Sequence, residues 1–311
     1  MKILLLDKNH PLITKQLSEK GFVLEEDFSS SYEQVLEKIH LYEGIIIRSR
    51  IPLDAHFLEK AKNLKFIARV GAGMENIDTA KAQELDIKLI NSPEGNKDAV
   101  AEHVIGTLLV LMNRLFISSN EVKKGIWLRE ENRGEEILGK TFGIIGYGNM
   151  GKAVAKRLSG FGCKTIFHDI KPNLSDEFAA QVSLQELQEN ADILSLHTPL
   201  TEDTLYMIDE EFISKMKKNF YFINTARGKN LKTSALVNAL KLGKIKGACL
   251  DVLEYEKTSF ENLETKNEDL EYLLNSEKAI ITPHIAGWTH ESKIKLAQVI
   301  VDKILAFAAE N

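Results

Sequence analysis

The sequence is poor in cysteine, and its apolar residues never form a long run. Two cysteines, Cys163 and Cys249, lie far apart inside apolar segments of the 311 residues. We therefore expect two buried thiols rather than a redox pair or metal ligands, and no metal site. Apolar runs such as Leu108–Met112 are far shorter than the roughly 18 residues that a membrane-spanning helix needs. The sequence thus predicts no membrane partner.

Basic residues are not in excess either. Forty Lys and Arg against 45 Asp and Glu give a net charge of −5, spread along the chain. Such a balance predicts no basic face for nucleic acid. The N-terminal run Ile3–Leu6 is followed at once by Asp7 and is too short for the apolar part of a secretion signal. We therefore expect a first strand there and a cytoplasmic protein.

Strand and helix patterns alternate along the chain in two blocks, an order that predicts parallel sheets covered on both faces. In the first block the expected strands are residues 3–6, 44–47, 65–69 and 87–90, and the expected helices are residues 11–20, 32–40 and 55–61. In the second block the expected strands are residues 142–145, 165–168, 192–197, 221–224, 247–250 and 280–282. The fold class is therefore α/β, and we expect each block to form one doubly wound domain.

A helical pattern from Ala99 to Phe116 joins the two blocks. Apolar residues recur in it at helical spacing, namely Val100, Val104, Leu108, Leu111 and Leu115. The pattern suits a helix that crosses between domains and presents a face to a second subunit, and it suits a plain core helix equally well.

The last part of the chain divides into a polar segment and a helix. Residues 257–278 are rich in Glu, Asn and Lys, which predicts a solvated surface segment. Its expected apolar anchors are Leu270, Leu273 and Leu274. A further helix is expected from Glu291 to Ala308, and it could cross back to the first domain.

A glycine-rich motif stands between an expected strand and an expected helix. Its residues are Gly146, Tyr147, Gly148, Asn149, Met150 and Gly151. A motif of this form, followed about 20 residues later by an acidic residue, here Asp169, is typical of dinucleotide binding. Its glycines allow a tight turn, approach of backbone N–H groups to a pyrophosphate, and close packing of helix on sheet.

The residue at the end of the next strand bears on the choice of dinucleotide. Asp169 can accept hydrogen bonds from the ribose hydroxyls and would repel a 2′-phosphate. We therefore predict NAD rather than NADP. His168 and Lys171 lie beside Asp169, and they leave open whether NADP is tolerated.

Oxidation of a hydroxyl by NAD requires a group that removes the hydroxyl proton, and histidine suits that task near neutral pH. His284 directly follows the last expected strand, and ligands bind at the carboxyl ends of strands in open α/β sheets. His103 and His197 are rival candidates, for which we favour a structural role.

Charged residues follow the two preceding strands. Arg227 comes after residues 221–224 and could pair with a substrate carboxylate. Asp251 and Glu256 come after residues 247–250. One of these carboxylates could orient His284 and stabilise its protonated form.

Four blocks, residues 71–78, 146–151, 225–228 with 251–256, and 282–287, resemble the D-isomer-specific 2-hydroxyacid dehydrogenases in sequence and order. The resemblance implies a flavodoxin-like substrate-binding domain (residues 1–97 and 286–311) and a Rossmann NAD-binding domain (residues 98–285), with the reaction in an interdomain cleft. It also implies a catalytic set of Arg227, Glu256 and His284.

The same resemblance implies the binding residues. Those for the cofactor are Gly146, Gly148, Asn149, Met150, Gly151, Asp169, Thr198, Pro199, Thr225, Ala226, Asp251 and Gly287. Those for the substrate carboxylate are Gly71, Ala72 and Gly73. A homodimer through the NAD-binding domains and the joining helix is the commonest assembly in such proteins.

Within that family the chain looks most like short D-3-phosphoglycerate dehydrogenases, because it ends just after the closing helix. Arg50 and Arg69, with Arg48, are then candidates for binding a substrate phosphate. Glyoxylate/hydroxypyruvate reductase and D-lactate dehydrogenase are the alternatives within the family. An NAD(H)-sensing protein that resembles a corepressor is the alternative of another class.

The chain departs from the family pattern at three positions. Lys257 stands where proline is frequent, Glu75 where aspartate is usual, and Asp98 where serine or threonine is common. Lys257 puts the local placement of Glu256 in question.

Overall fold

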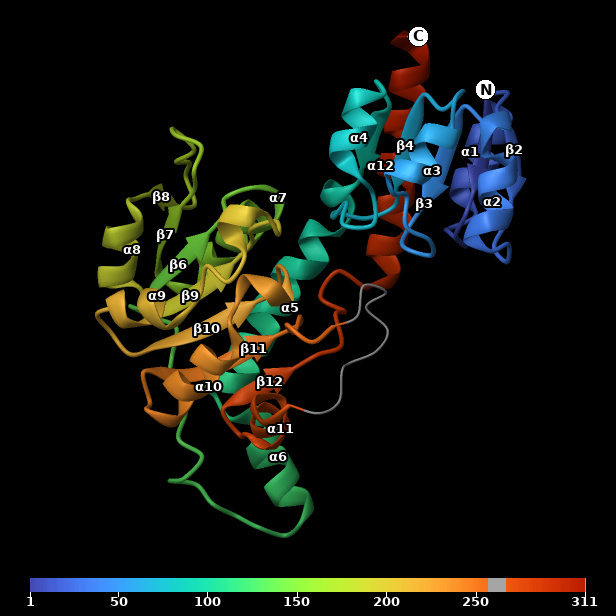
Figure 1. The fold of residues 1–311 in the computed structure, drawn as a ribbon. Helices are drawn as coiled ribbons and strands as arrows, with labels where there is room; N and C mark the ends of the chain where they lie inside the picture. Colours follow the sequence, from blue (N-terminus) through green and yellow to red (C-terminus); the bar gives the residue numbers. More distant parts are fainter. Residues whose placement is uncertain (257–266, 311) are drawn as a thin grey trace. The chain divides into compact units, whose positions relative to one another are not determined.

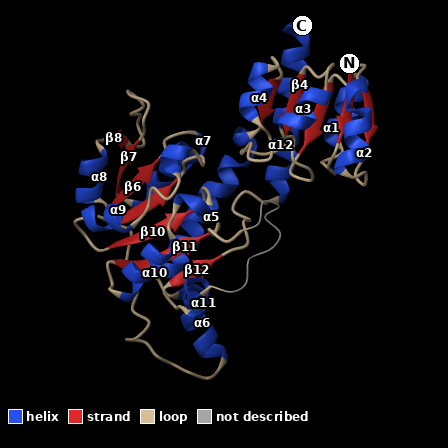
Figure 2. Cartoon of the chain, viewed as in Figure 1, coloured by secondary structure: helices blue, strands red, loops and turns tan. Residues whose placement is uncertain are grey.

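The computed structural model describes residues 1–256 and 267–310 (Figures 1 and 2). Contacts within the chain divide it into two compact units. Unit 1 contains Met1–Asn96 and the segment from Trp288 onward, and unit 2 contains Lys97–Gly287. Each unit has its own parallel sheet with helices on both faces. The predicted α/β class with two parallel sheets is confirmed.

Unit 1 is built on five parallel strands in the order β2-β1-β3-β4-β5. The strands are β1 (Lys2–Leu5), β2 (Val23–Glu26), β3 (Gly44–Ile47), β4 (Phe66–Arg69) and β5 (Lys88–Asn91). The helices are α1 (Leu12–Glu19), α2 (Tyr32–Lys38), α3 (Ala55–Lys60), α4 (Thr79–Glu84) and α12 (His290–Glu310).

Alternation of side chains along the strands of unit 1 creates two hydrophobic cores. Ile3 and Leu5 of β1 pack with α1 and α12, whereas Leu4 packs with α2, α3 and α4. Ile46 and Ile45 of β3 are divided between the two cores in the same way. Because both faces of the sheet are covered, the fully buried residues of its inner strands are apolar on both faces, and the charged residues Lys2 and Arg69 stand at strand ends.

Unit 2 contains seven parallel strands in the order β12-β11-β10-β9-β6-β7-β8. They are β6 (Thr141–Ile145), β7 (Lys164–His168), β8 (Ala180–Gln181), β9 (Ile193–Leu196), β10 (Phe220–Asn224), β11 (Ile245–Leu250) and β12 (Ala279–Ile281). Its helices are α6 (Leu115–Lys123), α7 (Asn149–Leu158), α8 (Leu184–Asn190), α9 (Glu210–Lys215), α10 (Thr233–Lys241) and α11 (Glu268–Asn275). The helix α5 (Pro93–Met112) runs from unit 1 into unit 2.

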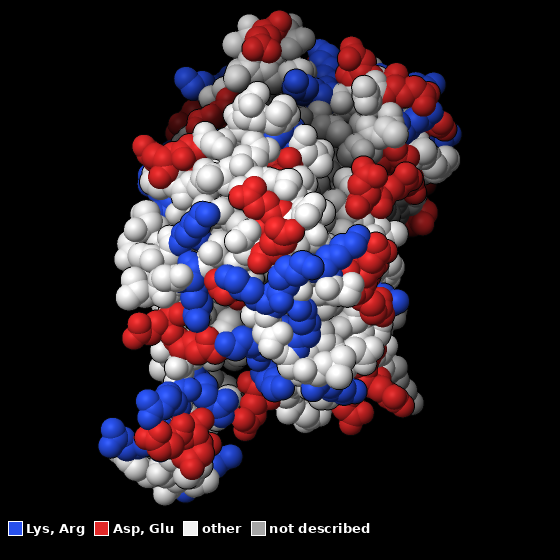
Figure 3. All heavy atoms as spheres, turned by 90° about the vertical axis from the view of Figure 1, so that its left-hand side faces the viewer, with Lys and Arg blue, Asp and Glu red and all other residues white. Residues whose placement is uncertain are grey.

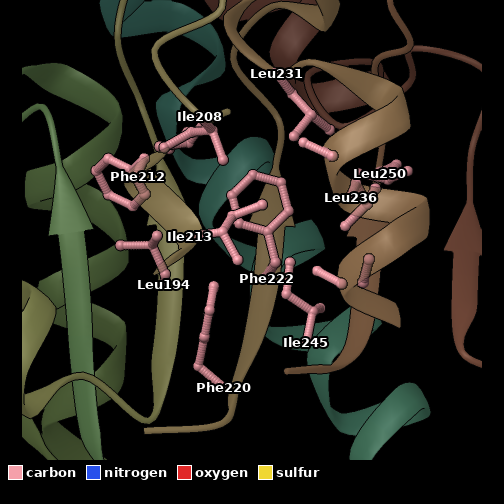
Figure 4. Packing of buried hydrophobic residues seen from close by; sticks show 14 of the residues in the cluster. Leu194, Ile208, Phe212, Ile213, Phe220, Phe222, Leu231, Leu236, Ile245 and Leu250 are labelled. Atoms are coloured by element: carbon pink, nitrogen blue, oxygen red, sulfur yellow. The ribbon is translucent and has the colours of Figure 1, made fainter. Parts of the chain in front are cut away.

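The strand β10 shows how the core of unit 2 is divided. Phe220 and Phe222 face the core that α8, α9, α10 and α11 cover, and the ring of Phe222 lies among Ile213, Leu194 and Ile245 (Figure 4). Tyr221 and Ile223 face the opposite core, formed with α5 and α7. A strand buried on both faces therefore holds the middle of the sheet.

The joining helix ends earlier than the apolar pattern predicts. The helix α5 stops at Met112, and Arg114 adopts a left-handed conformation with φ 51° before α6 begins at Leu115. Leu115 therefore does not continue the apolar face of α5, and its side chain is 51% exposed. The prediction of one helix from Ala99 to Phe116 is wrong at its carboxyl end.

The described part of the polar segment, residues 267–278, contains a helix that the sequence did not predict. Residues 268–275 form α11, whose first turn is capped by the Asn267 side chain. Leu270 and Leu273 are buried in the core, whereas Leu274 is 60% exposed and does not act as an anchor. The part of the prediction that concerns residues 257–266, including the Lys257 departure, lies outside the described residues.

The surface of unit 2 in Figure 3 carries both kinds of charge, with acidic groups next to basic ones. Ion pairs near α9 have the same mixed character, for example Lys215 with Glu211 at 2.6 Å and Lys232 with Glu210 at 3.1 Å. Within residues 1–256 and 267–310, no single helix is long and apolar enough to cross a membrane. The pair Lys97–Met112 and Leu115–Lys123 meets that test only when joined across a 58° bend.

Candidate active site

The carboxyl ends of the unit 2 strands form one edge, because all seven strands are parallel. The strand order reverses beside β6, with β7 and β8 on one side and β9 to β12 on the other. Ligands bind outside the carboxyl ends of strands at such a reversal. The segments after β6, β7, β9, β10, β11 and β12 carry the site residues predicted in unit 2.

His284 and Glu256 come together at this edge. The His284 Nδ1 lies 2.9 Å from Glu256 Oε2, and the other carboxylate oxygen accepts the Leu253 backbone N–H. The side chains of His284 and Glu256 are 27% and 13% exposed. An ionised carboxylate only accepts hydrogen bonds, so Nδ1 carries the proton and the lone pair of the neutral ring is on Nε2.

The segment that carries His284 is held by Asp251, which is 2% exposed. The carboxylate of Asp251 accepts hydrogen bonds from Thr282 Oγ1 at 2.6 Å, Ile285 N at 2.8 Å and Ala286 N at 2.8 Å. The Asp251 carbonyl oxygen also accepts the His284 backbone N–H at 2.8 Å. Asp251 thus fixes the backbone on both sides of His284, while Glu256 bonds to the ring.

Arg227 is the third predicted catalytic residue, and a turn after β10 presents it at the same edge. Asn224, the buried last residue of β10, donates from Nδ2 to Arg227 O at 2.9 Å and accepts the Ala226 N–H at 3.0 Å. A Cβ on Gly228 would lie 1.9 Å from Leu253 O. Glycine is therefore required where the Arg227 turn meets the segment that leads to Glu256.

Asn224 was not among the residues that the sequence analysis selected. Its side chain closes the turn that contains Thr225 and Ala226, so it determines where the predicted cofactor contacts lie. The sequence feature that could have identified Asn224 is an amide residue at the last position of an apolar strand, directly before a turn. Such side chains form hydrogen bonds to nearby backbone groups.

The glycine motif forms the turn between β6 and α7. Gly146 has φ 91°, and a Cβ there would lie 2.6 Å from His197 O. A Cβ on Gly151 would lie 2.2 Å from Gly146 O, whereas one on Gly148 would meet no atom within 4 Å. The space beside Gly148, at the start of a helix that continues with Asn149 and Met150, fits a pyrophosphate.

Asp169 follows β7 and connects the glycine turn with the next loop. Its carboxylate accepts the Tyr147 N–H at 2.7 Å and the Lys171 N–H at 2.9 Å. These bonds orient the carboxylate beside the glycine turn. A carboxylate in this position suits the ribose hydroxyls of NAD.

Thr198 and Pro199 follow β9, and Thr225 follows β10. Pro199 O accepts the Thr204 hydroxyl at 2.7 Å, which shapes the loop. The buried Thr225 Oγ1 has no hydrogen-bond partner among the described residues. A buried hydroxyl without a partner, at the edge where the cofactor is expected, fits a polar group of that cofactor. Gly287 is the last residue of unit 2.

The two rival histidines have protein partners within unit 2. His103 Nε2 lies 3.1 Å from Thr282 Oγ1 and 3.7 Å from Asp251 Oδ1. His197 Nε2 lies 2.9 Å from Ser195 Oγ, and burial lowers the pKa of His197 to about 4. A histidine with so low a pKa stays neutral near pH 7, which suits a structural role.

The substrate residues predicted in unit 1 lie at the carboxyl edge of its own sheet. Arg50 donates to three backbone carbonyl oxygens, those of Leu6, Ser30 and Asp27. Its nitrogens are thus used to hold the loops after β1 and β2. These contacts use three of its five N–H donors, and the binding of a substrate phosphate by Arg50 stays a prediction.

The glycine loop after β4 divides into a bonded and an open part. The Gly71 N–H donates to Ser92 Oγ at 3.0 Å and to Arg69 O at 2.9 Å, and the Arg69 guanidinium occupies the space of a Gly71 Cβ. The Ala72 and Gly73 N–H groups have no acceptor within the described ranges. Ala72 and Gly73 are thus better placed than Gly71 to bind an anion.

Comparison with known proteins identifies the family. Residues 105–286 match the model of the D-isomer specific 2-hydroxyacid dehydrogenase, NAD binding domain. This chain belongs to the D-isomer-specific 2-hydroxyacid dehydrogenases. It is an NAD-dependent oxidoreductase that acts on the CH–OH group of D-2-hydroxy acids, as the relatives of this family are.

Three similar members of this dehydrogenase family differ in the substrates that their names give. Hydroxypyruvate reductase of Thermotoga maritima is 36% identical over 88% of this chain and 87% of its own length. D-3-phosphoglycerate dehydrogenase of Archaeoglobus fulgidus is 33% identical over 99% of this chain but only 57% of its own length. The structure of Aquifex aeolicus D-lactate dehydrogenase with NAD and lactic acid has a TM-score of 0.84 at 31% identity, covering 100% of this chain and 96% of that one.

Proposed function

We propose that this dehydrogenase acts on a 2-hydroxy acid that carries a phosphate ester, D-3-phosphoglycerate, and on the matching 2-keto acid. The observation that carries the proposal is Arg48, a second guanidinium at the carboxyl edge of the unit 1 sheet. Unlike Arg50, it makes no side-chain hydrogen bond among the described residues. A substrate with a phosphate in addition to its carboxylate would use such a group.

His284 is proposed to remove the hydroxyl proton. In the oxidation, His284 Nε2 accepts this proton while the hydrogen on C2 leaves as hydride, for which bound NAD supplies the acceptor. In the reverse direction the imidazolium returns the proton to the keto oxygen. Glu256, 2.9 Å from Nδ1, stabilises the charged ring and holds its orientation.

Two groups are proposed to bind the substrate carboxylate. The Arg227 guanidinium pairs with it and polarises the carbonyl during reduction. Ala72 and Gly73 donate backbone N–H groups to it from unit 1. Unit 1, residues 1–96 and 288 onward, is accordingly proposed as the substrate-binding domain, and unit 2 as the NAD-binding domain.

The substrate is tested by following NADH oxidation with 3-phosphohydroxypyruvate, hydroxypyruvate, glyoxylate and pyruvate. We expect kcat/KM for 3-phosphohydroxypyruvate to exceed that for hydroxypyruvate by roughly tenfold or more, because a charge-assisted phosphate contact is worth about 1.5–3 kcal/mol. A higher value for hydroxypyruvate or glyoxylate would instead establish the reductase alternative, which the Thermotoga maritima relative favours. Pyruvate as the best substrate would indicate a D-lactate dehydrogenase. The alternative of an NAD(H)-sensing protein is not supported, because the similar proteins named above are enzymes.

The proton-transfer role is tested with His284→Ala. We expect kcat to fall by about 10²–10⁴-fold while NADH binding, followed by fluorescence, is retained. Glu256→Gln should lower kcat less, because the imidazole remains. Leu242→Ala, at a side chain that is 84% exposed, is the control. A His284→Ala enzyme with nearly unchanged kcat would disprove the assignment.

A homodimer is proposed on the basis of an apolar surface on unit 2. Leu115, Phe116 and Val122 of α6 are 51%, 63% and 50% exposed, and Trp127 and Leu138 beyond it are 75% and 67% exposed. Several large exposed apolar side chains within residues 115–138 favour a protein contact. Sedimentation equilibrium tests the proposal, since a monomer at micromolar concentration would contradict it. The cytoplasmic location stays a prediction.

A further inference from the structure

Arg48 is the residue that follows β3, the middle strand of the unit 1 sheet. Its backbone N–H donates to Asp7 Oδ2 at 2.7 Å, and its carbonyl oxygen accepts from Arg69 Nε at 3.2 Å. Burial lowers the pKa of the Arg48 guanidinium, and the charge of Asp7 opposes this effect. An arginine side chain nevertheless stays charged in proteins. A partly desolvated charge without a hydrogen-bonded partner is costly, which indicates that an anion completes the site.

The guanidinium of Arg48 does have one close neighbour, the indole of Trp288. The Arg48 Cζ lies over that ring, 4.3 Å from its centroid. Both residues belong to unit 1, where Trp288 is the first residue of the returning segment. The indole is 64% exposed, so core packing does not explain a tryptophan at this position.

We propose that Trp288 is a positioning residue that holds the Arg48 guanidinium for the phosphate group of the substrate and so favours phosphorylated over unphosphorylated 2-keto acids. This inference rests on the proposed function. With its Cζ held over the indole, the Arg48 guanidinium has no hydrogen-bond acceptor among the described residues, so its in-plane N–H groups are available to an anion. Without the ring, the flexible side chain would be drawn to the carboxylate of Asp7, the charge that already acts on it.

The kinetic test compares Trp288→Leu, which keeps an apolar side chain, with Trp288→Phe, which keeps an aromatic face. We expect Trp288→Leu to raise KM for 3-phosphohydroxypyruvate roughly 2- to 30-fold, the factor that corresponds to a lost cation–π contact. The KM for hydroxypyruvate and both kcat values should change by less than about twofold, and Trp288→Phe should recover much of the loss. Leu242→Ala is the matched control, since it removes another exposed apolar side chain. Equal increases of KM for both substrates would show a merely structural role and overturn the proposal.

A binding test separates this inference from the proposed function. The protein contains two tryptophans, Trp127 and Trp288, so the emission that Trp288→Phe removes belongs to Trp288. Titration with inorganic phosphate should change that emission saturably in the wild type, and Arg48→Leu should abolish the change. If 3-phosphohydroxypyruvate is not turned over but this response is present, the proposed substrate fails and the Trp288–Arg48 anion site stands. If phosphate leaves the emission of Trp288 unaltered, the inference is refuted.

Discussion

Replacing Asp251 by asparagine tests whether a buried carboxylate fixes the catalytic loop. Its oxygens accept three hydrogen bonds, from Thr282 Oγ1, Ile285 N and Ala286 N. An asparagine keeps one accepting oxygen and turns an NH₂ group toward a backbone N–H, so at least one bond to a charged group is lost. Each such bond is worth about 1.5–3 kcal/mol, and the donor left buried adds a further penalty, so we expect a loss of about 3 kcal/mol.

Asp192→Asn is the matched control in the same unit. The Asp192 carboxylate also accepts a backbone N–H, from Thr141 at 2.8 Å, but it is 27% exposed and pairs with Lys218 at the surface. Water can replace these contacts, so the expected loss is about 1 kcal/mol or less.

The assay is urea unfolding of unit 2 followed by the emission of Trp127 in a Trp288→Phe background, because the two tryptophans lie in different units. The kcat of Asp251→Asn should fall as well, since its loop carries His284. A free energy of unfolding no lower than that of Asp192→Asn would refute the argument that Asp251 holds this loop.

Two further predictions concern unit 2. Burial lowers the pKa of His197 from its ordinary 6.5 to about 4, so between these pH values the unfolded chain binds more protons than the folded one. The neutral, buried His197 therefore contributes its full stability above about pH 6.5 and loses it as the pH falls toward 4. The free energy of unfolding of the wild type should therefore fall more between about pH 7 and about pH 5 than that of His197→Gln, by up to about 2 kcal/mol. Equal decreases in the wild type and in His197→Gln would contradict this. In Gly228→Ala the new Cβ would lie 1.9 Å from Leu253 O, so we expect the Arg227 turn to be displaced and kcat/KM to fall roughly 100-fold. The control is Gly160→Ala, whose Cβ would have no atom within 4 Å and which should retain activity.

The sequence was sufficient for the parts of the fold that follow from burial on both faces of a sheet. The run Gly44–Ile47 is apolar at every position and is β3. The strand β2 was missed because none of the four residues Val23–Glu26 is fully buried and two of them are acidic. The helix α4 was missed because Thr79–Glu84 is short and has one buried residue, Ala82. The end of α5 depends on the backbone of Arg114, which no periodic pattern reveals.

The sequence placed the candidate site at the strand ends but not the individual bonds within it. Asp251 and Glu256 were equal candidates for orienting His284, since both follow the same strand. Only the fold shows that Glu256 bonds to the ring and Asp251 to the backbone. The arginines of unit 1 were likewise equal candidates for binding a phosphate. The fold shows that the Arg50 side chain donates to three backbone carbonyl oxygens, whereas the Arg48 side chain donates to none. Such distinctions depend on contacts between residues far apart in the chain.

The backbone of His284 explains why two carboxylates are needed after β11. His284 has φ 55°, a left-handed conformation that costs a residue other than glycine about 1–3 kcal/mol. The bonds from Asp251 to Ile285 and Ala286 offset that cost and keep the backbone in place. Glu256 then has only the ring to fix, through Nδ1. Because the backbone is fixed independently of the imidazole, the ring can change its protonation during the reaction without moving the loop.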